Sequence, residues 1–167
     1  MDVADVVRGL AGIEWAWAPV PVDAALKLAG WTEAGSLSYR RDYQLDGFEL
    51  SSYFDDDGWS WLEIELEARE AELGNSWPEG VADEFRDRWA HTTAAVAGVL
   101  GNPAFQGHPV EPGFPVDQNA NWAAVWVLPT ARFLITQTHE GKEFPYCVSL
   151  QCTPPDVPDW MNLYEER

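Results

Sequence analysis

The chain has 167 residues, of which 28 are acidic and 10 are basic, so its formal net charge is −18. This length suits one domain, and a chain with 46% hydrophobic and 13% aromatic residues can fill a core, which argues against disorder. The charge argues against nucleic acid or an anionic membrane as a ligand and favours a basic partner.

Two short helices are predicted at the N-terminus. Asp2 can cap the first helix, because apolar residues recur after it at helical spacing. Pro21 suits the first turn of the second helix, over residues 22–29, and Gly30 is its natural stop.

Three strands are predicted next, at residues 36–44, 48–54 and 59–67, because apolar and polar side chains alternate in each of them. Residues 55–58, with the sequence Asp-Asp-Asp-Gly, form a hairpin turn before the third strand, since Asp and Gly tolerate positive φ. The even positions of the third strand, from Ser60 to Leu66, form its core face.

A long helix is predicted after these strands. Ser76 and Glu79 form a capping box that marks its start, and the helix runs to about Leu100. Its apolar stripe predicts one buried face. The members of that stripe are Val81, Phe85, Trp89, Thr92, Val96 and Val99.

The rest of the chain predicts a second block of strands. Residues 101–121 contain several prolines and glycines and are expected to be irregular. Strands follow at 122–128, 132–138 and 144–152, and residues 153–167 form a proline-rich C-terminal tail.

This order of elements predicts an α+β fold in a single domain that spans residues 1–152. We expect an antiparallel sheet of about six strands, made of two βββ blocks. The long helix and the short N-terminal helices are expected to pack on one face of this sheet. The sequence leaves open whether the two blocks share one sheet.

The acidic residues are concentrated between residues 42 and 72. This segment contains eleven acidic residues and one basic residue, Arg69. Side chains at alternate positions of a strand share one face, so Glu63, Glu65 and Glu67 are expected to form a row of carboxylates. The predicted partner-binding residues, which include the neighbouring aromatic side chains as anchors, are Glu49, Tyr53, Asp55, Asp56, Asp57, Trp59, Trp61, Glu63, Glu65 and Glu67. The alternative is a solvated outer face, with Trp59 and Trp61 covered by a helix or the tail.

Other chemistry is not supported by the sequence. The spacing of an EF-hand is absent after Asp55, so the turn is the better interpretation, and no metal or cofactor is expected. His108, in the proline-rich loop, is the one histidine placed for a loop-borne site. Because no nucleophile–base pair or metal-ligand cluster occurs, we expect no enzymatic activity.

The expected compartment is the cytoplasm. The N-terminal sequence lacks the basic and apolar regions of an export signal, and no segment is predicted to span a bilayer. Cys147 and Cys152 are five residues apart in one predicted strand, which places them on opposite faces as two free thiols.

Gly30-Trp31 and residues 132–150, with the sequence RFLITQTHEGKEFPYCVSL, resemble a group of small acidic actinobacterial proteins of uncharacterised domain type. Such proteins look like the immunity partners of polymorphic toxins. The resemblance implies a small cytoplasmic α+β protein that binds a toxin domain tightly, and it implies no catalytic residues.

Two functions of different kinds follow as hypotheses. The first is an immunity protein that occludes a cognate basic toxin domain in a 1:1 complex, where the toxin acts on nucleic acids or nucleotides. The alternative is a binding module similar to secretion chaperones, which dimerises and holds an unfolded segment of an exported effector.

Overall fold

The computed structural model describes residues 1–54, 60–70, 77–115, 117–139 and 144–156. This part of the chain contains three helices and eight strands. In chain order they are α1 (Val3–Ala11), α2 (Pro19–Leu28), β1 (Thr32–Ser36), β2 (Arg40–Leu45), β3 (Phe48–Phe54), β4 (Ser60–Arg69), α3 (Val81–Leu100), β5 (Phe105–Gly107), β6 (Trp122–Val127), β7 (Arg132–Thr138) and β8 (Tyr146–Thr153).

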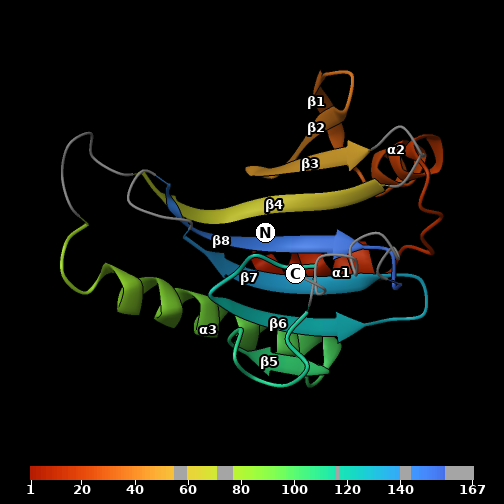
Figure 1. Cartoon of the computed structure of the whole chain (residues 1–167). Coiled ribbons are helices and arrows are strands. Elements are labelled where there is room, and N and C mark those ends of the chain that lie inside the picture. The colour runs from red at the N-terminus through yellow and green to blue at the C-terminus, as the bar shows by residue number, and fades with distance from the viewer. Residues whose placement is uncertain (55–59, 71–76, 116, 140–143, 157–167) are drawn as a thin grey trace.

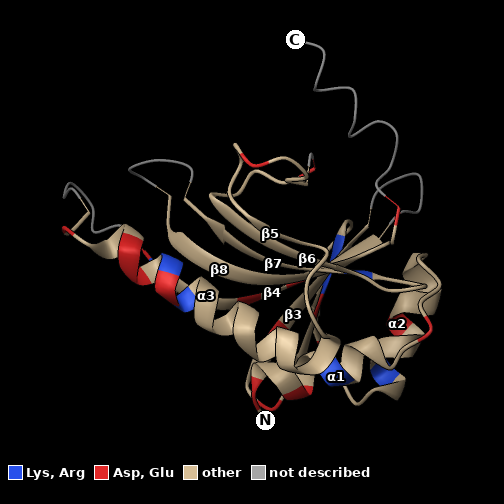
Figure 2. Ribbon diagram, turned by 90° about the horizontal axis from the view of Figure 1, so that it is seen from below, with Lys and Arg blue, Asp and Glu red and all other residues tan. Residues whose placement is uncertain are grey.

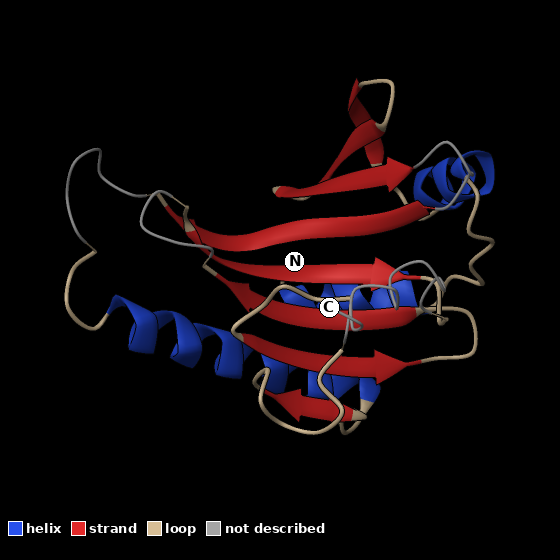
Figure 3. Ribbon diagram, in the orientation of Figure 1, coloured by secondary structure: helices blue, strands red, loops and turns tan. Residues whose placement is uncertain are grey.

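All eight strands belong to one antiparallel sheet with the order β1-β2-β3-β4-β8-β7-β6-β5 (Figure 1). The central pair, β4 and β8, joins the two blocks of strands that the sequence predicted. Helices α1 and α3 lie behind the sheet in Figure 3, and the view of Figure 2 shows them on one side of it. The α+β class and the antiparallel sheet are therefore confirmed, whereas the expected number of about six strands is wrong.

Two short strands account for the difference. The predicted strand 36–44 corresponds to β2, and an additional strand, β1, lies before it. A tight turn joins the two strands, in which the Leu37 amide donates to the Arg40 carbonyl over 2.7 Å. That turn contains no Gly, Pro, Asn or Asp, so its polar–apolar alternation resembles a continuous strand. The other missed strand, β5, has only three residues and lies inside the segment that was expected to be irregular.

The predicted starts of the three helices agree with the structure to different degrees. The cap at Asp2 is confirmed, because its carboxylate accepts from the Asp5 amide over 2.9 Å. Helix α2 begins at Pro19, two residues before the predicted proline. The predicted capping box is wrong, since α3 begins at Val81 after Gly80, a left-handed residue with φ of 85°; Ser76 lies outside the described residues.

The main core lies between the helices and the covered face of the sheet. The predicted stripe of α3 is confirmed at Phe85, Trp89 and Val96, which are buried against the strands. The Trp89 indole also donates to the Ile135 carbonyl over 3.0 Å and so fixes the helix against β7. On β4 the even positions Leu62 and Ile64 face this core, as predicted.

The described part of the chain covers the second face of the sheet at one end only. The loop between β5 and β6 crosses in front of β6 and β7 in Figure 1. It is held there by a buried ion pair in which Arg132 of β7 binds Asp117 of the loop. Within the described residues, strands β2, β3, β4 and β8 are left with an open face. Among the described residues no helix has the length and apolarity needed to cross a membrane.

Candidate functional site

A groove of about 580 Å³ lies on the open face of the sheet. It forms where β3 and β4 separate: these strands pair only from Ser51–Glu63 to Phe54–Ser60, although β4 continues along β8 to Arg69. The β1–β2 hairpin contributes one side of the groove, and β8 contributes the other. The side chains that define its chemistry are Arg40, Asp42, Glu49, Ser51, Tyr53, Glu63, Glu65, Cys147 and Ser149.

Strand register brings the polar side chains of the groove together. Asp42 of β2 lies opposite Ser51 of β3, Ser51 lies opposite Glu63 of β4, and Glu63 lies opposite Gln151 of β8. Residues paired in this way share one face of the sheet. The Ser51 hydroxyl donates to the Asp42 carboxylate over 2.8 Å, which fixes one end of this row.

Glu63 is a partly buried carboxylate of the groove. Burial raises the pKa of Glu63 above its usual value, and the neighbouring charge of Glu65 acts in the same direction. Hydrogen bonds from Ser149 and Gln151 of β8 oppose this shift only in part. Glu65 is exposed and accepts a long contact from the Cys147 thiol at 3.8 Å. The two carboxylates therefore share a pocket in which one charge disfavours the other.

Aromatic and basic side chains occupy the opposite end of the groove. Tyr53 and Trp61, a cross-strand pair of β3 and β4, stack with ring centroids 5.1 Å apart and an interplanar angle of 13°. Arg40 of β2 is hydrogen-bonded to Tyr53 and forms an ion pair with Asp42 at 3.0 Å. Arg40 is the one basic residue among the described lining of the groove, and its charge is already balanced there.

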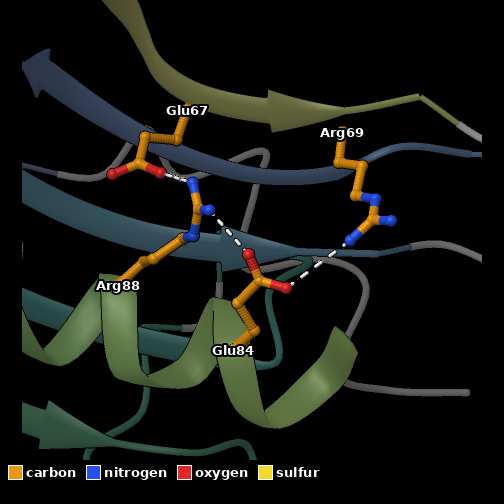
Figure 4. A network of polar contacts seen from close by, with 4 residues as sticks. All are labelled: Glu67, Arg69, Glu84 and Arg88. Carbon is orange, nitrogen blue, oxygen red and sulfur yellow. Dashed lines mark hydrogen bonds and ion pairs between the residues drawn. The ribbon is translucent and has the colours of Figure 1, made fainter. Parts of the chain in front are cut away.

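The predicted row of three carboxylates is wrong at Glu67. A β-bulge shifts the register of β4, so that Glu65 lies opposite Ser149 but Glu67 lies opposite Val148. Glu67 therefore points to the helix side of the sheet, where it binds Arg88 of α3 (Figure 4).

Glu67 belongs to a network of alternating charges at the helix–sheet boundary. Arg88 also pairs with Glu84 at 2.6 Å, and Glu84 pairs with Arg69 at 3.5 Å (Figure 4). Each carboxylate of this network has a basic partner. The network is structural and lies on the face opposite the groove.

The ten predicted partner-binding residues divide into three groups. Glu49, Tyr53, Glu63 and Glu65 line the groove, and Trp61 adjoins it through its stack with Tyr53. Glu67 faces the helices. Asp55, Asp56, Asp57 and Trp59 lie outside the described residues.

Sequence reasoning missed the contributions of β2 and β8. Alternation along the last strand places Cys147, Ser149 and Gln151 on one face, but it does not show that this face adjoins Glu63 and Glu65. That information is in the β4–β8 pairing, which joins residues far apart in the chain. Asp42 was counted among the acidic residues of the segment without being assigned to the site.

The thiol of Cys147 does not make the groove reactive. Burial, aided by the charges of Glu65 and Glu63, raises the pKa of Cys147 to about 11, despite a contact with the Ser149 hydroxyl at 3.3 Å. A thiol in this state is a poor nucleophile and a poor metal ligand at neutral pH. Within the described ranges no group of three or more His, Cys, Asp and Glu side chains is arranged to hold a metal ion. Cys147 and Cys152 lie on opposite faces as free thiols, as predicted.

His108 lies away from the groove lining. Its ring packs edge-on against Trp122 at 5.3 Å, and its Nε2 lies 3.3 Å from the Glu111 carboxylate. These contacts support the loop between β5 and β6. Comparison with known proteins finds no matching family model, no matching curated protein and no matching solved structure.

Proposed function

We propose that this protein is an immunity-type inhibitor that binds a basic toxin domain through the acidic groove on its open sheet face. The observation that carries the proposal is the charge of the groove lining, where Asp42, Glu49, Glu63 and Glu65 face a single base, Arg40. Because Arg40 balances Asp42, three carboxylates remain for a partner to neutralise.

Three properties of the groove support the binding of a protein partner. It is set on paired strands, so its side chains are held in fixed positions before a partner arrives, which lowers the entropy lost on binding. Its acidic field would steer a basic domain toward it and repel nucleic acid. The half-buried Tyr53–Trp61 stack at one end supplies aromatic surface of the kind that dominates binding energy.

A toxin that acts on nucleic acids or nucleotides fits this surface best. Such a domain needs a cationic cleft to hold its phosphate-bearing substrate. Carboxylates at Glu49, Glu63 and Glu65 would occupy that cleft in place of phosphates and occlude the active site. This mode of inhibition requires a folded toxin domain and favours a 1:1 complex.

Co-expression tests the proposal. The chain should restore growth to cells that express the toxin domain encoded beside its gene, and light scattering should show a 1:1 complex. The double charge reversal E63K/E65K should abolish rescue. A matched variant, E14K/E79K, makes the same change in net charge at two exposed carboxylates outside the groove and should preserve rescue.

Three results would count against the proposal. Rescue by E63K/E65K would show that the groove is not the binding surface. A gene neighbourhood without a toxin domain would remove the expected partner. A dimer that binds only an unfolded effector segment would favour the secretion-chaperone alternative.

A further inference from the structure

Every basic residue in the described part of the chain forms an ion pair with a carboxylate of the same chain. Ten basic residues occur in the sequence, and eight of them lie in the described ranges. Each of the eight has a carboxylate within 4.0 Å; they are Arg8, Lys27, Arg40, Arg41, Arg69, Arg86, Arg88 and Arg132. Figure 2 shows basic positions along α3, on α1 and on strands of the sheet.

The carboxylates on the two faces of the sheet differ in whether they have a basic partner. On the helix side, Glu67 and Glu84 share Arg88, and Glu84 also pairs with Arg69. In the groove, Glu49, Glu63 and Glu65 have no basic group of the described chain within 4.0 Å. The groove is thus short of positive charge, and a bound partner can provide it.

The chemistry of these carboxylates selects the kind of cation. Ionised carboxylates only accept hydrogen bonds, so the complementary group is one that only donates. Glu63 and Glu65 are at alternate positions of β4, which places their backbones about 6.8 Å apart on one face. A guanidinium has five donors in a rigid plane and can bridge two such carboxylates, whereas an ammonium is a compact point charge.

We infer that the Glu63–Glu65 end of the groove is a receptor for an arginine side chain that projects from the partner. The inference rests on the proposed function and specifies the group that this surface recognises. Glu63 and Glu65 would take the two edges of the guanidinium. The hydroxyl of Ser149 and the amide of Gln151 hold Glu63 in place from β8, so these two act as positioning residues.

Model peptides test the inference without the toxin. We expect capped hexa-arginine to bind about tenfold more tightly than capped hexalysine by calorimetry, and hexa-citrulline, which has no charge, to show no binding. Amide resonances that shift on titration should belong to β3, β4 and β8. In E63Q/E65Q the preference for arginine over lysine should disappear. The matched variant E14Q/E79Q loses the same charge and should keep the preference.

The inference is overturned if hexalysine binds as tightly as hexa-arginine, or if E63Q/E65Q and E14Q/E79Q weaken binding equally, as a diffuse charge effect would require. Its failure is distinct from failure of the proposed function. A toxin domain that binds the wild type but not E63K/E65K, together with no arginine preference, would refute the arginine receptor alone. An arginine preference without binding of any toxin domain would support the receptor and refute the immunity role.

Discussion

The buried ion pair between Arg132 and Asp117 allows a quantitative test of how the loop before β6 is held on the sheet. The two side chains are only 6% and 3% exposed. Arg132 Nη1 donates to Asp117 Oδ1 over 3.1 Å, and its Nε donates to the Thr153 hydroxyl over 3.1 Å. We expect Arg132→Met to destabilise the protein, because it leaves the Asp117 carboxylate buried without a counter-charge.

The size of the effect follows from burial. Removing one partner of a buried ion pair lowers the free energy of unfolding by about 3–5 kcal/mol. For a domain of this length that corresponds to a fall in Tm of roughly 6–20 °C. Replacing both partners, in Arg132→Met/Asp117→Leu, removes the unpaired charge and should return the stability to within about 1 kcal/mol of the wild type.

Urea unfolding followed by tryptophan fluorescence measures these differences, provided that the m-value stays constant. Arg86→Met is the matched control, because Arg86 pairs with Asp83 on the surface with exposures of 45% and 71%, and its loss should change the free energy of unfolding by less than about 1 kcal/mol. A loss below about 1 kcal/mol for Arg132→Met would refute the reasoning. So would a double variant that is as unstable as the single one.

Three further predictions concern β4 and β8. Glu65→Lys should weaken hexa-arginine binding about tenfold, whereas Glu67→Lys should leave it unchanged by calorimetry, because the bulge turns Glu67 to the helix side. Glu63→Gln should raise the free energy of unfolding at pH 7, since burial raises the pKa of Glu63 in the folded protein. This gain should shrink as pH falls through that raised pKa and vanish below the unfolded value of about 4.3, which urea unfolding across pH will show. The Cys147 thiol, with a pKa of about 11, should react with iodoacetamide only after unfolding, as followed by mass spectrometry.

Alternation of apolar and polar residues along the sequence predicts the strands whose position depends only on neighbouring residues. Strand β3 matches the predicted range, and the alternation along β4 places Leu62 and Ile64 in the core, because a strand's period reports which face is buried. The turn between β1 and β2 was missed because its residues carry no turn signal. Strand β5 was missed because three residues are too few to show a period.

The sequence of β4 alone predicts only part of the candidate site, because the rest depends on how β4 pairs with β3 and β8. The position of Glu63 and Glu65 on the open face follows from alternation alone and is confirmed by their place in the groove. The reversal of Glu67 follows from the register of β4 against β8, and no feature of the β4 sequence marks the bulge. The groove likewise exists because β3 and β4 separate beyond the Ser51–Glu63 pair, which is a property of the pairing.

The bulge divides the acidic segment into two parts with different roles. Beyond it, Glu67 is paired with Arg88 and contributes to packing of α3 on the sheet. Before it, Glu63 is enclosed and its ionised form is disfavoured by burial and by Glu65, so this carboxylate lowers stability at neutral pH. The facing positions of β8 hold the neutral side chains Ser149 and Gln151, which shows that this face accepts uncharged polar residues. The proposed role of Glu63 in binding a cation would explain why a charge that lowers the stability of the fold stands at this position.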